Sequence, residues 1–347
     1  MDERAEIAVV GAGVMGAATA RALARAGHDV VLLEQFELGH TRGSSHGEAR
    51  IFRLVYADPQ YVRMAQRALP LWRELEAESG EQILTTHGSV DLGPGTDERV
   101  AALSECGVEF DVVDGIDLAS RYPLRIEGGT AALLQRDGGV LNAAAAQRAF
   151  LRGVRVRERA RVNSIDEGRV QLDGGATEAR AVVVTAGAWV SRLVEPLGIR
   201  LPVTPTRETV AYVAVENGDR LPTVIDWRVP AGYDLPRPGD SVYALPSPQG
   251  LKVGVHRAGP PTDPDEEGVV DAEAVRCASD WVERYVEGVQ PTPVRTETCL
   301  YTNMPDESFV LERHGRLVVG SPCSGHGFKF APVVGEELAR LAIEAAA

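Results

Sequence analysis

Hydrophobic positions near the start of the chain change from the spacing of a buried strand to that of a helix and back. Residues 7–10 form a continuous apolar run, an Ala-rich segment follows residue 16, and a second apolar run ends at Glu34. This pattern predicts a strand, a helix and a second strand in close succession. The turn before the helix carries Gly11, Gly13 and Gly16, spaced as G-x-G-x-x-G. The combination is typical of a βαβ unit that binds a dinucleotide at the N-terminus of its helix.

Each residue of the motif has a physical role in such a unit. Gly11 permits the tight turn, Gly13 lets phosphate oxygens approach backbone N–H groups, and Gly16 brings the helix close to the strand. Glu34 can accept the hydrogen bonds of a ribose diol, and its charge disfavours a 2′-phosphate. These residues leave open whether the dinucleotide is NAD or FAD.

The spacing of apolar residues also predicts the elements of the remaining chain. Helical spacing recurs at residues 59–78, from about 142, at 271–286 and from about 330 to the end. Pro70 lies inside the first of these segments and is expected to kink the helix. Strand-like spacing recurs at 154–156, 181–185, 317–319 and within the longer stretches 82–137 and 201–300. We therefore expect an α/β fold of mixed α+β character.

Segments that alternate strand and helix, as in a dinucleotide-binding domain, are separated along the chain by longer strand-rich stretches. This arrangement predicts discontinuous domains. A Rossmann-like dinucleotide-binding domain is expected from residues 1–80, 139–205 and 307–347. Residues 81–138 and 206–306 are expected to form a second, substrate-binding domain on a mixed or antiparallel sheet.

Composition narrows the possible partners. The 347 residues include 36 basic and 50 acidic side chains and carry a net charge of −14, which disfavours binding to nucleic acid or to an anionic membrane surface. No apolar run approaches a membrane span, and the first strand leaves no room for a signal peptide, so we expect a soluble cytoplasmic protein. The four cysteines have no metal-binding or disulfide spacing, and no metal site is expected.

Charged residues in polar loops are the first candidates for chemistry. Arg50 and Arg53 are three apart, so on a helix they would share a face and could grip a carboxylate or pyrophosphate, although they could equally be surface arginines. Lys329 stands directly before the last helix, where an anion would be attracted. His46 and His326 lie in glycine-rich loops and are candidate bases or local hydrogen-bond partners.

Two further candidates lie on expected strands. In residues 250–256, alternation places Lys252 and His256 on one face and apolar side chains on the core face. Cys299, considered alone, is expected to be a small buried hydrophobic residue.

Five motifs, in order along the chain, give a more specific indication. They lie at residues 11–16, 44–53, 250–256, 299–301 and 324–330. Together they make the sequence similar to the monomeric sarcosine oxidase and N-methyltryptophan oxidase family, within the D-amino acid oxidase-like flavoproteins. The resemblance runs from residue 5 to the last helix. It implies FAD rather than NAD, and an antiparallel sheet as the roof of the substrate pocket.

The resemblance also implies roles for individual residues. Cys299 would hold the flavin through a thioether at its 8α-methyl group, Arg53 and Lys329 would hold the substrate carboxylate, and Lys252 would activate oxygen. The substrate pocket would be lined by His256 and Tyr243. The flavin would be contacted by Arg50, His46, Met15, Ser44, Val162, Ala186, Gly187, Trp189, Gly325, Gly327 and Lys329, in addition to the glycine motif and Glu34.

The implied activity is oxidation of secondary amino acids of the sarcosine type. A hydride would pass from the C–N unit to FAD, the imine would hydrolyse, and O2 would reoxidise the flavin to give H2O2 in a monomeric enzyme. Alternatives are an oxidase of cyclic imino acids such as pipecolate or proline, a flavin dehydrogenase, an NAD-dependent dehydrogenase and a non-enzymatic dinucleotide sensor. The sequence departs from the family at residues 216–240, in a shortened segment near 142–156, and in an expected lack of the C-terminal tail. The amine substituent therefore stays open.

Overall fold

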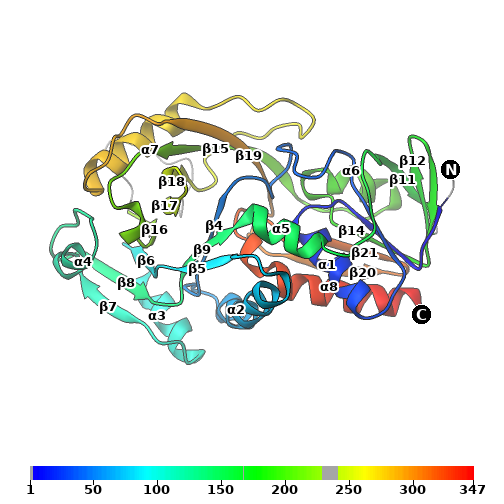
Figure 1. Cartoon of the computed structure of the whole chain (residues 1–347), viewed down its shortest axis with the longest axis horizontal. Helices are drawn as coiled ribbons and strands as arrows, with labels where there is room; N and C mark the ends of the chain where they lie inside the picture. Colours follow the sequence, from blue (N-terminus) through cyan, green and yellow to red (C-terminus); the bar gives the residue numbers. More distant parts are fainter. Residues whose placement is uncertain (1–2, 167, 229–240) are drawn as a thin grey trace.

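The computed structural model describes residues 3–166, 168–228 and 241–347, and two large sheets dominate it (Figure 1). One sheet has six strands, five of them parallel and the last, β20, antiparallel at one edge. Its order is β10 (Val156–Arg157), β3 (Val30–Leu33), β2 (Ile7–Val10), β14 (Ala181–Val184), β21 (Leu317–Ser321) and β20 (Val310–His314). Parallel strands are buried on both faces, which explains their continuous apolar sequences.

Helices cover one face of this six-stranded sheet. They are α1 (Val14–Arg25), α2 (Pro59–Ser79), α5 (Ala143–Leu151) and α8 (Ala331–Ala346). The shared core includes Ile7 and Leu32 from the sheet and Trp72 and Phe330 from the helix side, all fully buried. Helix α2 continues through Pro70 without a break. No helix in the described ranges is both long and apolar enough to cross a bilayer.

The other face of the six-stranded sheet packs against a small four-stranded sheet that the sequence pattern missed. Its strands are β1 (Glu3–Arg4), β13 (Gly175–Glu178), β12 (Arg169–Leu172) and β11 (Val162–Asp166). Only a few of its side chains, such as Ile165 and Val170, enter the core. Strands this short, with one exposed face, leave a weak apolar signal. Beside this sheet the chain continues from β14 into the short helices η1 (Gly187–Trp189), α6 (Val190–Val194) and η2 (Glu195–Leu197).

The second large sheet has eight strands. Its order is β19 (Arg295–Asn303), β15 (Thr204–Val213), β18 (Gly250–Val255), β17 (Val242–Ser247), β16 (Thr223–Asp226), β6 (Ser89–Leu92), β8 (Ala131–Gln135) and β7 (Asp111–Asp114). All neighbours are antiparallel except β16 and β6. Helices α7 (Ala272–Tyr285) and α4 (Gly115–Arg121) share its core, whereas α3 (Thr96–Glu105) packs against α2 and β8. The mixed α/β class expected from the sequence is confirmed.

A three-stranded sheet lies between the two large ones (Figure 1). It is formed by β4 (Ala49–Phe52), β9 (Gly139–Asn142) and β5 (Leu84–Thr86). The six-stranded sheet takes its strands from residues 7–33, 156–184 and 310–321, and the eight-stranded sheet from 89–135 and 204–303. How these segments divide into domains stays a prediction.

The helical arrangement considered for Arg50 and Arg53 is wrong. Arg50 lies on strand β4, paired with Leu141, and Arg53 directly follows the strand. Successive side chains of a strand point to opposite faces, so residues three apart diverge. The two arginines accordingly bind different partners.

Candidate functional site

One cavity of about 1390 Å³ is lined by residues from both large sheets. The six-stranded sheet contributes residues at or next to the carboxyl ends of its parallel strands: Val10, Leu33, Glu34, Thr185 and Gly320. The eight-stranded sheet contributes Tyr243, Leu245, Lys252, Cys299 and Tyr301. The carboxyl ends of parallel strands are the usual binding position in open α/β sheets. The site is thus formed by joining that edge to a wall of antiparallel strands.

The glycine motif shapes one part of this cavity. Gly11 has a φ of 95°, and a Cβ atom there would lie 2.7 Å from the Thr185 carbonyl oxygen. A Cβ atom on Gly16 would lie 1.9 Å from the Gly11 carbonyl oxygen, so the helix approaches the turn as expected. Gly13 is the N-cap of α1 and offers no side-chain cap, while the Val14 N–H donates to Ser45 Oγ at 2.9 Å. The start of α1 is therefore open to an anion.

Glu34 lies at the end of β3 and is buried, with an exposed fraction of 5%. Its Oε2 accepts the Ala12 N–H at 2.8 Å and its Oε1 accepts the Phe36 N–H at 3.0 Å. Burial alone would raise the pKa of Glu34, but the hydrogen bonds from His40, Phe36 and Ala12 lower it below the usual value. The side chain is an ionised carboxylate with acceptor capacity left for a ligand.

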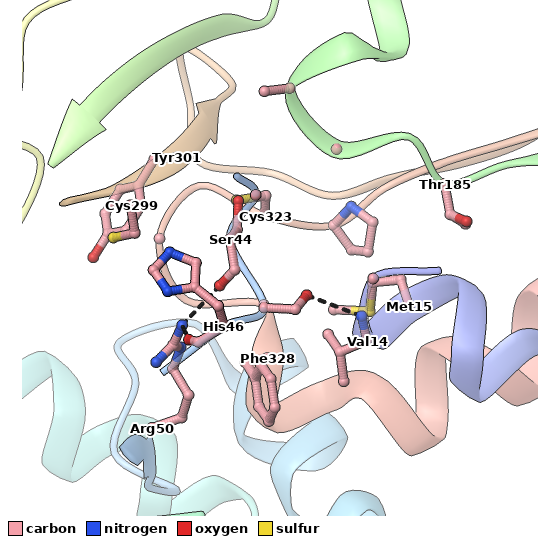
Figure 2. A pocket seen from close by; sticks show the side chains of 18 of the residues that line it. Val14, Met15, Ser44, His46, Arg50, Thr185, Cys299, Tyr301, Cys323 and Phe328 are labelled. Carbon is pink, nitrogen blue, oxygen red and sulfur yellow. Dashed lines mark hydrogen bonds between the residues drawn. The ribbon is translucent and has the colours of Figure 1, made fainter. Parts of the chain in front are cut away.

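The polar loop 44–48 and the start of β4 form the next part of the wall (Figure 2). Arg50 Nη2 donates to the carbonyl oxygens of Ser44, at 2.8 Å, and of His46, and so fixes the loop from within. Ser44 Oγ donates to the Leu300 carbonyl at 2.5 Å, which ties the loop to β19. His46 Nε2 is buried and has no partner in the described residues. Burial and the charge of Arg50 lower the pKa of His46 to about 4, so a neutral imidazole faces the cavity.

Lys252 and Cys299 lie on β18 and β19. The apolar residues next to Lys252 face the core, as the alternation predicted, and its Nζ donates to the Ala49 carbonyl at 3.2 Å. Burial, and then the charge of Arg50, lower the pKa of Lys252 to about 7. Burial raises the pKa of the Cys299 thiol. Burial likewise raises the pKa of Tyr243 on the neighbouring strand β17, which keeps its hydroxyl neutral.

A second group of cations surrounds Tyr56. Lys329 Nζ donates to Tyr56 Oη at 2.8 Å and to the His326 carbonyl at 2.7 Å. The Arg53 guanidinium lies 4.4 Å from the centroid of the Tyr56 ring. Burial, and then Arg53, hold the pKa of Lys329 well below its usual value. Burial, and then the charges of nearby cations, lower the pKa of His256 to about 3, so its imidazole is neutral in this part of the cavity.

Lys252 and Lys329 are the only lysines in the sequence, and both are buried in this cavity. Every other basic residue is arginine. A lysine amine can lose its proton when buried, whereas a guanidinium keeps its charge. Lysine scarcity is therefore a signal in the sequence that would have singled out both positions.

The structure brings nearly all the predicted site residues to this one cavity. Those not yet described that line it are Met15, Val162, Ala186, Gly187, Trp189, Gly325 and Gly327. Gly16 is set back behind Gly11. Gly325 has a φ of 76°, and a Cβ atom there would lie 2.2 Å from the Tyr301 ring, so only glycine fits. Of the segment 216–240, residues 229–240 lie outside the described ranges, while Ile225 and Trp227 line the cavity.

Several lining residues were not found from the sequence: Ser45, Tyr56, Arg99 and Trp227. Ser45 lies within the motif at 44–53 but was given no role, whereas Tyr56, Arg99 and Trp227 belong to no motif and only the fold brings them together. Within the described ranges, no group of three or more His, Cys, Asp or Glu side chains is arranged to hold a metal ion. The four cysteines are free thiols.

The residues present fit an adenine dinucleotide. The cavity is large enough for a cofactor of this size, and it joins an open helix N-terminus to an ionised carboxylate at a strand end. The unpartnered nitrogen of His46 and the buried cations supply further polar contacts.

Comparisons with known proteins agree with this geometry. A family model described as FAD dependent oxidoreductase (DAO) matches residues 6–341. The peroxisomal sarcosine oxidase of Homo sapiens is 34% identical, over 97% of this chain and 91% of its own. The monomeric sarcosine oxidase of Bacillus sp. (strain B-0618) is 32% identical, over 99% of this chain and 93% of its own. The solved structure of NikD, an unusual amino acid oxidase essential for nikkomycin biosynthesis, has a TM-score of 0.86 and 27% identity, covering 99% of this chain and 94% of NikD.

Proposed function

Because the chain belongs to the DAO family of FAD-dependent oxidoreductases, we propose that it oxidises small secondary amino acids and passes the electrons to O2. The observation that carries this proposal is that Arg53 and Lys329 both contact Tyr56, in the cavity that also holds the glycine motif. The division into a discontinuous FAD-binding domain and a substrate domain, at the boundaries given above, is part of the same proposal.

Bound FAD supplies the acceptor for a hydride from the substrate and later delivers the electrons to O2. Glu34 accepts hydrogen bonds from the ribose, and the open N-terminus of α1 receives the pyrophosphate. We propose that Cys299 attaches the cofactor covalently and that Arg50 and His46 contact it, because these side chains line the same cavity.

Arg53 and Lys329 hold the substrate carboxylate. Binding of a carboxylate places an anion next to Lys329 and raises the depressed pKa of its amine, so the lysine becomes charged as the substrate binds. Two charge-assisted contacts then fix the position of the amino acid. Their positive field also favours loss of the substrate ammonium proton, and only the neutral amine can release a hydride from the adjacent carbon. The neutral groups of His256 and Tyr243 line the substrate pocket.

Lys252 serves the reaction with oxygen. Its protonated amine is held by the Ala49 carbonyl and places a positive charge where negative charge develops as O2 is reduced. A pKa near 7 means that both protonation states are populated at neutral pH. The same residue can therefore accept and release a proton.

The proposal is tested with the purified holoenzyme. Sarcosine, N-methylalanine, pipecolate and proline are added anaerobically while the flavin spectrum is recorded, and H2O2 is measured after air is admitted. Bleaching of the yellow absorbance by a secondary amino acid, with peroxide formed at each turnover, is expected. Failure of every amine to bleach the flavin would refute the proposal, and bleaching without peroxide would identify a dehydrogenase. An acid-precipitated pellet that stays yellow is the expected sign of covalent flavin, and size-exclusion chromatography tests the expected monomer.

A further inference from the structure

A further buried cation, Arg99, lines the cavity, and the proposed reaction does not use it. It belongs to the first turn of α3 and is 8% exposed. Its Nη1 donates to the Pro94 carbonyl at 2.8 Å, and its Nε lies 4.0 Å from Asp91 Oδ1. Its Nη2 makes no hydrogen bond within the described ranges, and the residue lines the cavity.

Arg99 is close to the residue proposed to bind the substrate carboxylate. Arg53 Nη1 lies 3.2 Å from Asp91 Oδ1, the same oxygen that faces Arg99. The indole of Trp227 lies beside both guanidinium groups, with its centroid 4.3 Å from Arg99 and 5.8 Å from Arg53. Its Nε1 also donates to Asp91 Oδ1, at 3.0 Å. Two cations are thereby fixed around one carboxylate.

Among the residues that the structure describes, the charges in this group do not balance. Arg53 and Arg99 line the cavity, whereas Asp91, which is 1% exposed, lies behind them and supplies a single negative charge. Lys329 adds another positive charge when a carboxylate binds. A substrate with only one carboxylate leaves a buried guanidinium without a full counter-charge, and this costs free energy. A substrate with a second anionic group removes that cost.

Acidic side chains elsewhere in the cavity wall are engaged in other contacts. Asp58 Oδ1 accepts the Gln60 N–H at 2.7 Å as the N-cap of α2, and Asp306 Oδ1 accepts the Ser308 N–H at 3.0 Å. Glu307 forms an ion pair with Arg257. Within the described ranges, the carboxylate that pairs with Arg99 is Asp91, which is already shared with Arg53. An incoming anion therefore meets a guanidinium that is only partly neutralised.

We infer that Arg99, flanked by Trp227, binds a second anionic group on the substrate side chain, so that the preferred substrates are N-substituted amino dicarboxylates of aspartate or glutamate size. The inference rests on the proposed function. Both guanidinium groups reach one oxygen of Asp91, so a short dicarboxylate spans the distance between them. A planar guanidinium suits recognition of a carboxylate, and stacking on an indole fixes its orientation.

The test compares N-methylglutamate with its neutral isostere N-methylglutamine in wild-type holoenzyme, Arg99→Met and Arg99→Lys. We expect wild type to favour the dicarboxylate in kcat/KM, and Arg99→Met to lower that preference by about 10- to 100-fold, the value of a charged hydrogen bond. Arg99→Lys retains part of the preference because it retains the charge. Arg136→Met is the matched control, since Arg136 pairs with Asp111 on the surface and its side chain is 82% exposed. This variant should leave the preference unchanged.

A binding measurement separates this inference from the proposed function. Glutarate and its monoamide, glutaramate, cannot be oxidised as amines, and their binding is followed by the shift of the flavin spectrum. Tighter binding of glutarate, lost in Arg99→Met, supports the subsite even if no amine is turned over. Equal binding of the two compounds, or an equal loss of kcat/KM for both amino acids in Arg99→Met, would mean that Arg99 only ties α3 to β6. Turnover of N-methylglutamine at least as fast as that of N-methylglutamate would also overturn the inference, while leaving amine oxidation established.

Discussion

Replacing Lys252 by Met is expected to stabilise the flavin-free protein, although it removes a functional group. The amine of Lys252 is buried, and burial and Arg50 lower its pKa from 10.5 to about 7. Folding thus forces a group that is protonated in the unfolded chain into an environment that favours its neutral form. Met has a similar length and carries no charge, so it fills the same space without this cost.

The size and pH dependence of the effect follow from the two pKa values. Because the folded-state pKa is lower than the unfolded-state pKa, the destabilisation is complete below pH 7, falls between pH 7 and 10.5, and vanishes above 10.5. At about 1.4 kcal/mol for each pKa unit, the cost is about 5 kcal/mol at pH 6 and about 2 kcal/mol at pH 9. The lost hydrogen bond to the Ala49 carbonyl reduces the gain at both pH values by about 1 kcal/mol.

The assay is guanidinium unfolding of flavin-free protein, followed by tryptophan fluorescence at both pH values. A Cys299→Ser background allows the cofactor to be removed and eliminates a thiol that faces Lys252. The pKa itself can be measured by NMR, because isotope-labelled lysine gives only two side-chain signals in this sequence and Lys252→Met assigns them. A variant no more stable than its parent, or a gain that does not shrink as the pH rises, would refute the reasoning.

In the holoenzyme, Lys252→Met should slow the reaction with O2 by about a hundredfold or more while reduction by substrate changes little; equal losses in both half-reactions, measured by stopped flow, would contradict its role. Arg53→Met should lower kcat/KM for secondary amino acids by about 10- to 100-fold, because one of two charge-assisted contacts is lost; an unchanged steady-state value would remove it from the carboxylate site. Gly325→Ala should reduce the free energy of unfolding by more than Gly80→Ala does. Both glycines have a similar positive φ, but a Cβ atom at residue 80 meets open space, whereas one at residue 325 meets the Tyr301 ring. An equal loss in denaturant titrations would mean that the ring moves aside at little cost. Cys299→Ser should release all flavin on acid precipitation, and a pellet that stays yellow would show that attachment lies elsewhere.

The amino-acid sequence by itself determined the local structure around the glycine motif. The strand Ile7–Val10, the helix Val14–Arg25 and the strand Val30–Leu33 follow from local periodicity, and the turn between the first two follows from the conformational freedom of Gly11. The family and the FAD cofactor expected from the five motifs are confirmed by the family match. Covalent attachment through Cys299 and the cytoplasmic location stay predictions.

Local pattern failed where structure depends on partners distant in the chain. The strands of residues 162–178 were missed because each buries only a few side chains, and their pairing with one another stabilises them. The helical arrangement of Arg50 and Arg53 was wrong because spacing alone cannot tell a strand paired with β9 from a helix.

The content of the cavity was decided by tertiary structure. Asp91 belongs to β6, Arg99 belongs to α3 and Trp227 directly follows β16, and no spacing in the sequence relates them. The parallel pairing of β16 with β6 brings Asp91 and Trp227 together, and α3 then presents Arg99 to the same indole. Periodicity reports which face of an element is buried, because that depends on near neighbours. Which cations share a pocket, and how far their pKa values shift, depends on distances between elements that only the folded chain fixes.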